Sequence, residues 1–425
     1  MLDLDFVREN TEKIKTALGN RGDKIDIDTL LDFDEQRRKL IHESEQLRSQ
    51  LNTASKKVAE LKKAKKNADE LIAQNRELAD KIKQFETERA SLDSRIKDIL
   101  LYIPNVPADD VPVGRTENDN SPVKSWGKPR EFAFKPLAHW DIARIHGLVD
   151  FDRAAKISGN NFALYIGDGA RLERALINFM LELHQTKHGY TEVLPPFLVN
   201  RKAMIGTGQL PKFEEDAYRC EVTDQFLIPT AEVPVTNIHA DEIIPGEELP
   251  IRYTAYSGCF RLEAGSYGKE TRGLLRVHQF NKVELVKFVR PETSCDEHET
   301  LLADAEEVLQ LLGLPYRVVT LCTGEMGFTA AKCYDIEVWA PGVERWLEVS
   351  SCSNFQDFQA RRANIRFKDK GSKPQFVHTL NGSGTALPRV VIALLEHYQN
   401  EDGTVSIPEP LRPFMRGQKV LGGQG

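Results

Sequence analysis

The sequence predicts an α+β protein in two parts: a long antiparallel pair of coiled-coil helices, then a domain built on an antiparallel β-sheet flanked by helices. Three observations carry this prediction. Residues 30 to 100 keep apolar side chains at spacings of three and four and contain no glycine or proline. A proline-rich stretch ends that pattern just after residue 103. Beyond about residue 120, strand and helix patterns alternate among many aromatic residues and glycines.

The apolar positions of the first part form a heptad seam on two helices. The seam runs from Phe33 to Leu61 and resumes from Leu71 to Ile99. The intervening residues 65–68 suit a turn. The spacing therefore predicts a hairpin of two helices of about 30 residues each, about 45 Å long at 1.5 Å per residue.

The tip of this hairpin is rich in lysine and holds one acid, Glu60. The lysines are Lys56, Lys57, Lys62, Lys63, Lys65 and Lys66. A basic tip on an acidic chain indicates contact with a phosphate backbone, read for position more than for base sequence. A solvated surface that keeps a long arm soluble explains the same lysines equally well.

Composition is that of an ordinary soluble globular protein, with 28% charged and 40% hydrophobic residues. No apolar run approaches the roughly 20 residues of a membrane helix, and the mixed-charge N-terminus lacks an apolar signal core. We therefore expect a cytoplasmic protein with no membrane partner. None of the six cysteines has a zinc-site spacing. The net charge of −7 argues against indiscriminate nucleic-acid binding, and DNA is not an expected partner.

The domain organisation follows from these patterns. We expect an N-terminal domain at residues 1–104 with its arm at about 30–100, a linker at 105–118, and a second domain at 119–425. In the second domain, strands are expected near 251–263, 275–288, 316–321, 333–340 and 344–352, and helices near 170–187, 296–312 and 387–399. The chain has no GxxxxGK[ST] loop, so a nucleotide must be held in another way.

Residues 260–284 carry the strongest chemical signal. They read as a strand, a long loop with Lys269 and Arg272, and a return strand that begins at Arg276. The first strand ends in Phe260-Arg261-Leu262-Glu263, and the return strand bears Phe280 and Glu284. An arginine fork suits a phosphate in transfer. A phenylalanine can stack on a purine, and a buried glutamate can pair with an ammonium group.

This arrangement resembles the second signature motif of the class II aminoacyl-tRNA synthetases, and its exact sequence resembles that of the bacterial seryl-tRNA synthetases. Two other segments resemble the remaining class II motifs. Residues 188–196 resemble the first motif, which forms the dimer interface in that family. Residues 382–389 resemble the third, with glycines that allow close approach of a nucleotide and with Pro388 at the first helical turn. Thr385, Ala386 and Leu387 depart from its glycine-rich form.

The resemblance implies sites for ATP and Mg²⁺, with Arg261 and Arg389 as catalytic residues and Arg389 against the adenine and γ-phosphate. An acid and a hydroxyl make a hard-oxygen pair suited to Mg²⁺, and by resemblance Glu348 and Ser351 hold it between the α- and β-phosphates. A cluster that caps a strand end is the alternative. The ATP-binding residues expected by resemblance are Arg261, Leu262, Glu263, Phe280, Glu348, Val349, Ser350, Ser351 and Arg389.

The amino acid is expected at Thr230-Ala231-Glu232, the tripeptide that binds it in the family. Two acids, Glu232 and Glu284, would then serve one small zwitterion. One would pair with its ammonium group and the other would accept from its hydroxyl. Asn381 and Ser383 are expected to complete the polar pocket. A site built around a substrate hydroxyl rejects analogues without it by up to about 10⁴–10⁵-fold.

The resemblance, which covers essentially the whole chain, implies ATP-dependent aminoacylation of tRNA(Ser) with L-serine through a seryl-adenylate, by a homodimer. A selenocysteine tRNA is an additional candidate acceptor. The lysines expected on the tRNA are Lys62, Lys63, Lys65 and Lys66. One alternative is a ligase that loads serine on a carrier other than tRNA, which the basic arm disfavours. Another is an inactive RNA-binding relative, which should have lost some of the five residues Arg261, Glu263, Glu284, Glu348 and Arg389.

Overall fold

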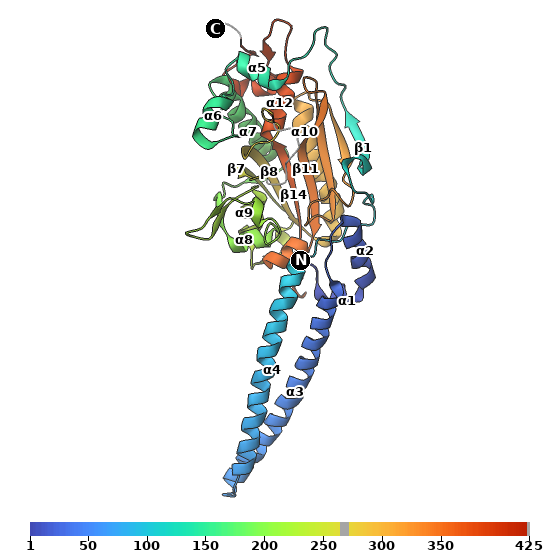
Figure 1. The fold of residues 1–425 in the computed structure, drawn as a ribbon, viewed down its shortest axis with the longest axis vertical. Helices are drawn as coiled ribbons and strands as arrows, with labels where there is room; N and C mark the ends of the chain where they lie inside the picture. The colour runs from blue at the N-terminus through green and yellow to red at the C-terminus, as the bar shows by residue number, and fades with distance from the viewer. Residues whose placement is uncertain (264–271, 423–425) are drawn as a thin grey trace. The chain divides into compact units, whose positions relative to one another are not determined.

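The computed structural model describes residues 1–263 and 272–422. The chain divides into two compact units. The N-terminal unit comprises residues 2–19 and 23–103, and the sheet unit comprises residue 1, residues 20–22 and residues 104–425. Figure 1 shows the helical hairpin of the first unit and the layered sheet of the second. No helix in the described ranges combines the length and apolarity needed to cross a bilayer.

Two long helices dominate the N-terminal unit, which confirms the predicted hairpin. Its helices are α1 (Leu4–Glu9), α2 (Thr11–Arg21), α3 (Ile27–Lys63) and α4 (Asp69–Tyr102). Asp26 caps α3, because its carboxylate accepts a hydrogen bond from Thr29 N at 3.1 Å. The seam is buried toward the base of α4, at Ile82, Leu92 and Ile96, and only half-buried nearer the tip. A pair of helices with no third partner leaves its seam partly open to water.

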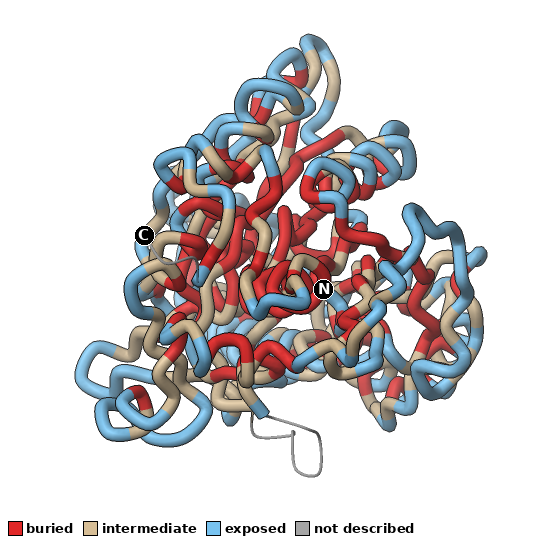
Figure 2. The backbone as a smooth tube through the Cα atoms, turned by 90° about the horizontal axis from the view of Figure 1, so that it is seen from above, coloured by how far each residue is buried: buried red, intermediate tan, exposed pale blue. Residues whose placement is uncertain are grey.

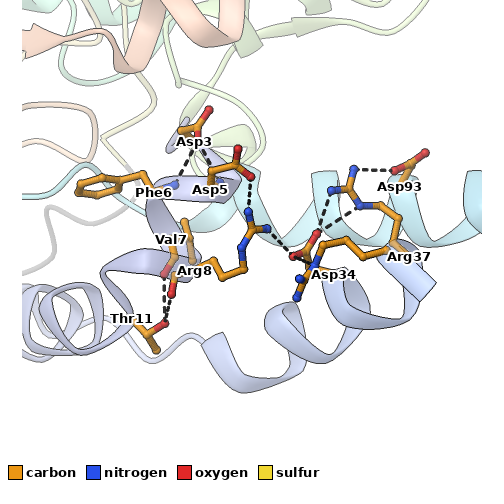
Figure 3. A network of polar contacts seen from close by, with 10 residues as sticks. Asp3, Asp5, Phe6, Val7, Arg8, Thr11, Asp34, Arg37 and Asp93 are labelled. Atoms are coloured by element: carbon orange, nitrogen blue, oxygen red, sulfur yellow. Dashed lines mark hydrogen bonds and ion pairs between the residues drawn. The ribbon is translucent and has the colours of Figure 1, made fainter. Parts of the chain in front are cut away.

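A buried carboxylate lies where the seam reaches the base of the arm, and the sequence did not predict it. Asp34 of α3 is 1% exposed and accepts from Arg8 Nη1 at 2.7 Å and from Arg37 Nη2 at 2.9 Å (Figure 3). Burial opposes its ionisation, but the hydrogen bonds from Arg8 and Arg37 outweigh burial and lower its pKa. The cluster therefore ties the short helix α1 to α3 with a charged, fully partnered group.

The sheet unit is built on an eight-stranded sheet in the order β1-β9-β10-β11-β14-β8-β7-β2. Every neighbouring pair is antiparallel except β2 with β7. The strands are β1 (Ser121–Trp126), β2 (Thr191–Glu192), β7 (Ile251–Phe260), β8 (Gln279–Val289), β9 (Tyr316–Thr320), β10 (Lys332–Ala340), β11 (Arg345–Gln356) and β14 (His378–Ala386). The predicted antiparallel sheet is thus confirmed, with one parallel edge strand.

Three helices cover one face of this sheet: α7 (Asp168–Thr186), α10 (Ser294–Leu311) and α12 (Leu387–His397). Their apolar sides and the strands share one continuous hydrophobic core, with Met180, Leu301 and Val390 fully buried in it or nearly so. Figure 2 shows the buried backbone gathered in the interior and the exposed backbone in the outer loops and turns. This burial holds the strands rigidly, so side chains on their other face are well positioned for chemistry.

Shorter elements complete the unit. A three-stranded sheet in the order β3-β5-β4 has its own small core, which includes Met204 and Phe226. The short strands are β3 (Leu198–Asn200), β4 (Arg219–Cys220), β5 (Gln225–Leu227), β6 (Ile243–Pro245), β12 (Arg366–Lys368), β13 (Gln375–Phe376), β15 (Val405–Ser406) and β16 (Val420–Leu421). The short helices are α5 (His139–Ile145), α6 (Phe151–Ser158), α8 (Arg201–Gly206), α9 (Glu232–Thr236) and α11 (Phe358–Ala363).

Two segments differ from expectation. The return strand β8 begins at Gln279 rather than Arg276, because the residues before it form turns held by bonds such as His278 N to Asn161 O at 2.9 Å. The stretch 105–118, expected as a linker, lies within the sheet unit. Asn105 is 5% exposed and donates through Nδ2 to Phe355 O at 2.8 Å, which fixes its start.

Candidate active site

A cavity of about 410 Å³ opens on the sheet face that lies opposite the three covering helices. Strands β8, β11 and β14 form its floor, and residues near α8 and residues 327–330 form its walls. Side chains alternate along a strand, so those beside core residues such as Val283 and Leu380 face the cavity. The expected residues that line it are Thr230, Glu232, Arg261, Glu263, Phe280, Glu348, Ser351, Asn381, Ser383 and Arg389.

Two β-bulges bring this set onto one face. Glu348 and Ser351 are three residues apart, so a regular strand would place them on opposite faces. The register of β11 shifts between Glu348 and Ser350, which leaves Val349 as an extra residue and turns both acid and hydroxyl toward the cavity. A second shift in β14 leaves Gly384 unpaired and keeps Ser383 on the cavity face.

The glycines of residues 382–389 have a packing role on the helix side of the sheet. A Cβ on Gly384 would lie 2.9 Å from His184 Nε2, and a Cβ on Gly382 would lie 3.0 Å from Cys352 Sγ. Both positions therefore face the helix layer, where the missing side chain permits close packing. The expected close approach of a nucleotide to this backbone stays a prediction.

One end of the cavity is cationic. Arg261 donates through Nε to Pro229 O at 3.3 Å, and its guanidinium carbon lies 5.1 Å from the centre of the Phe280 ring. Arg389, at the start of α12, donates through Nη1 to Glu348 O at 2.7 Å and to Glu348 Oε2 at 3.2 Å. Arg276 pairs with Glu263 at 2.9 Å. Two planar forks and an aromatic ring thus converge on one space, an arrangement suited to phosphates and a base.

The other end is small, buried and acidic. Glu284 is 1% exposed, and its Oε2 accepts from Thr230 Oγ1 at 3.0 Å while its Oε1 accepts from Asn381 Nδ2 at 3.0 Å. Lys282, which the sequence analysis did not single out, lines the cavity and forms an ion pair with Glu284. Its Nζ also donates to Thr230 Oγ1 at 2.8 Å. The contact with Thr230 arises because the loop before α9 packs against β8, and the order of residues along the chain does not show it.

The second acid, Glu232, lies at the start of α9 and is 6% exposed. Gln359 donates to its Oε1 at 2.6 Å. Burial, and then repulsion from Glu284, raise the pKa of Glu232 to about 7, against the opposing hydrogen bond from Gln359. The structure therefore brings the two predicted acids close together but gives them different environments, because Glu232 lines the cavity and Glu284 lies behind residues that line it.

The oxygen donors fit a magnesium ion held together with phosphates. Glu348 and Ser351 face the cavity, and Mg²⁺ commonly takes one or two protein oxygens beside phosphate and water. Desolvation opposes ionisation of Glu348, but Arg389 and Arg261 lower its pKa, so the carboxylate is available as a ligand. Asp335 pairs in register with Ser351 on the neighbouring strand, and burial and then Glu348 raise its pKa. Among the described residues, no cluster of three acidic, histidine or cysteine side chains forms a metal site without substrate.

Five expected residues are absent from the cavity lining. One of them, Glu284, is buried against Thr230, Lys282 and Asn381, which do line the cavity. Ala231 and Val349 are buried in hydrophobic cores, and Ser350 donates to Ser383 O at 2.6 Å on the helix-covered side. Leu262 donates its backbone N–H to Asp216 O at 3.1 Å and is absent from the cavity lining. Any contact of Ala231, Leu262, Val349 and Ser350 with a ligand would be through the backbone. Lys269, in the loop expected over a polyphosphate, lies outside the described residues.

The tip lysines lie where the hairpin turns. Lys62 and Lys63 end α3, and Lys65 and Lys66 follow in the turn. All four are exposed, as expected for side chains that meet either solvent or an RNA backbone.

The antiparallel sheet thus carries Arg261 just after β7, Arg389 in α12 after β14, and Glu348 of β11 beside Arg389. This arrangement is that of the class II aminoacyl-tRNA synthetase core, as the comparisons with known families show. Residues 216–398 match the family model described as the class II core domain of the glycyl, histidyl, prolyl, seryl and threonyl enzymes. Residues 1–107 match the model described as the seryl-tRNA synthetase N-terminal domain.

Relatives that match over nearly their whole length identify the family within this class. The chain is 56% identical to a serine–tRNA ligase of Thermodesulfovibrio yellowstonii, over 98% of this chain and 99% of that one. It is 58% identical to a serine–tRNA ligase of Geobacillus kaustophilus, over 99% and 100% of the two chains. The crystal structure of a Pyrococcus horikoshii seryl-tRNA synthetase complexed with ATP matches with a TM-score of 0.94, 40% identity and full coverage of both chains. The chain belongs to the seryl-tRNA synthetase family.

Proposed function

We propose that this chain is an enzyme that joins L-serine to tRNA(Ser) in two steps at the expense of ATP. In the first, a serine carboxylate oxygen bonds to the α-phosphorus of ATP while the bond from that phosphorus to its bridging oxygen breaks. Pyrophosphate leaves with the bonding electrons, and seryl-adenylate remains. In the second, a terminal ribose hydroxyl of the tRNA adds to the seryl carbonyl carbon and AMP leaves. The departing phosphate can accept the hydroxyl proton, so no side-chain base is needed.

One observation carries the proposal: a single cavity of about 410 Å³ joins a cationic end to a small acidic recess. The cationic end suits a nucleoside triphosphate, and the recess suits a small zwitterion with a hydroxyl group. Joining the two holds the carboxylate against the α-phosphate, and such positioning supplies much of the rate of reactions of this kind.

The two acids divide the serine between them. Glu284 already accepts from Thr230, Lys282 and Asn381, which leaves about one of the roughly four acceptor positions of a carboxylate. That single position suits the serine hydroxyl. Glu232 accepts from Gln359 and has more positions open, which suits the three donors of an ammonium group. Ser383 lines the same space and completes the polar surroundings.

ATP is proposed to lie along the cationic end. Arg261 contacts the α-phosphate, where charge develops as pyrophosphate leaves. Arg389 and Phe280 hold the adenine between a guanidinium group and a ring, and Arg389 reaches the γ-phosphate. Glu348 and Ser351 would hold Mg²⁺, which when bound neutralises phosphate charge. Glu263, paired with Arg276, orients the nucleotide from the strand end.

The N-terminal unit is proposed to bind the tRNA, and residues 119–425 to carry the chemistry. The helical hairpin contributes no described residue to the lining of the cavity. Its turn carries four clustered, exposed lysines: Lys62, Lys63, Lys65 and Lys66. Lysines of this kind bind phosphates without reading bases, so they would select a tRNA by its shape.

A homodimer in the cytoplasm is the proposed setting. Edge strand β2 ends the sheet, and Leu194 just after it is 77% exposed. An apolar side chain beside an open sheet edge favours pairing with a second copy. A cytoplasmic location is proposed because ATP and tRNA, the proposed substrates, are both found there.

Serine-dependent exchange of pyrophosphate into ATP tests the proposal. We expect exchange with serine and far less with threonine, alanine or glycine, since alanine leaves a buried polar partner unpaired and threonine adds a methyl group. Absence of exchange with serine under conditions where the protein is folded would contradict the proposal. It would favour the inactive RNA-binding alternative instead.

A further inference from the structure

We propose that Lys282 recognises the α-carboxylate of serine and so determines that the substrate is a free amino acid. This inference rests on the proposed function and adds a residue to it. The motif that pointed to the site contains this lysine but gives no sign of its role, because lysines on strands are ordinarily exposed. Here the side chain is only 7% exposed and lines the cavity.

The contacts of Lys282 leave part of its ammonium group available. An ammonium group has three donors. Thr230 Oγ1 accepts one at 2.8 Å, and the Glu284 carboxylate accepts another. Within the described part of the chain these two acceptors account for two donors, and the third remains for a ligand in the cavity that Lys282 lines.

The position of Lys282 also matches the charges of serine. Lys282 forms an ion pair with Glu284 on the same strand, and it is near enough to Glu232 for its charge to lower the pKa of that acid. A serine whose ammonium group meets Glu232 and whose hydroxyl meets Glu284 must place its carboxylate near a cation, since a buried unpaired carboxylate is costly. Lys282 and Arg261 are the cations beside the recess that line the cavity. Arg261 is assigned to the phosphate, which leaves Lys282 for the carboxylate.

A carboxylate held by one oxygen keeps its other oxygen free for attack. The bond to Lys282 therefore orients serine without blocking the reaction at the α-phosphorus. The same contact explains a preference for serine over a derivative of similar size that lacks the carboxylate charge, such as L-serinamide. Serinamide keeps both the amine and the hydroxyl, so the part of the preference that depends on Lys282 reports the carboxylate contact.

The test compares the binding of L-serine and L-serinamide by titration calorimetry near neutral pH. The unaltered protein is expected to prefer serine by on the order of 10- to 100-fold, the size of a hydrogen bond between charged groups. Lys282→Met should weaken serine binding by about that factor and leave serinamide binding nearly unchanged, so that the preference approaches one. Lys282→Arg, which keeps the charge, should retain part of the preference.

Lys287→Met is the matched control. Lys287 is a buried lysine on the same strand, but it faces the helix layer and donates to Glu297 Oε2 at 3.0 Å. This variant should keep the preference for serine. Equal losses of serine and serinamide binding in Lys282→Met, with ATP affinity intact, would overturn the inference and leave Lys282 as a support for Glu284. A preference unchanged in Lys282→Met would overturn it as well, while serine-dependent exchange by the unaltered protein would still uphold the proposed function.

Discussion

The raised pKa of Glu232 predicts that serine binding weakens in mild acid. If the serine ammonium group binds only the ionised carboxylate, the apparent KM for serine is multiplied by one plus the ratio of the proton concentration to the acid constant. With a pKa of about 7, that factor is near one at about pH 8 and about tenfold at about pH 6. Glu232→Gln should raise KM at both values and remove the dependence on pH.

The same group makes a prediction for stability, with a definite sign. The folded pKa of about 7 lies above the ordinary value of 4.5, so the folded protein binds this proton more tightly than the unfolded chain. The resulting stability is full below about pH 4.5 and is lost as the pH rises through about 7, by up to about 3 kcal/mol. Denaturant titrations should therefore show a more favourable difference in unfolding free energy, Glu232→Gln minus the unaltered protein, at about pH 8 than at about pH 5.

Pyrophosphate exchange at saturating ATP measures the serine KM directly. The KM for ATP, measured at each pH, serves as the control for the titration of the phosphates. A serine KM that stays constant from about pH 8 to about pH 6 would refute the reasoning. So would a Glu232→Gln variant that keeps the full pH dependence, since the titrating group would then lie elsewhere.

Three further predictions concern the arginine, the arm and a strained turn. Arg261→Lys should slow adenylate formation by about 10²-fold in the exchange assay because the bidentate fork is lost, and a normal rate would remove Arg261 from the phosphate. Deleting residues 35–98 and closing the gap with a short turn should leave exchange nearly intact and abolish tRNA charging; undiminished tRNA binding by that variant would contradict the role of the arm. Gly273→Ala should destabilise the protein by more than about 1–2 kcal/mol in denaturant unfolding, since Gly273 has a φ of +65° and its Cβ would lie 2.4 Å from His139 Nε2. Gly147→Ala, with a φ of +62° and open space around its Cβ, is the control that should lose only the backbone part.

Periodic features were predictable from the sequence because they depend on local spacing. The heptads of residues 30–100 predicted the two helices of the arm, and the alternating segments predicted strands β7 to β11 to within a few residues, but not β1 or β14. Bulges were not predictable in the same way. The sequence Glu348-Val349-Ser350-Ser351 does not indicate that one residue is left unpaired in the strand register. That bulge nevertheless determines which side chains face the cavity.

The residues missed by sequence reasoning depend on contacts between distant segments. Lys282 matters because Thr230 lies beside it, and Asp34 is buried because Arg8 of a separate helix reaches it. The pKa of Glu232 depends on burial and on Glu284, which lies on a different element. Residue type and order along the chain carry none of this information, since only the packed structure sets distance and desolvation.

Aminoacylation of a serine-accepting tRNA by the full chain tests the central claim most directly. The measurement follows radiolabelled serine into acid-precipitable tRNA in the presence and absence of ATP. We predict ATP-dependent acylation with serine attached to the terminal ribose. Serine-dependent pyrophosphate exchange without any acylation of tRNA would contradict the account and would favour a ligase that loads another carrier.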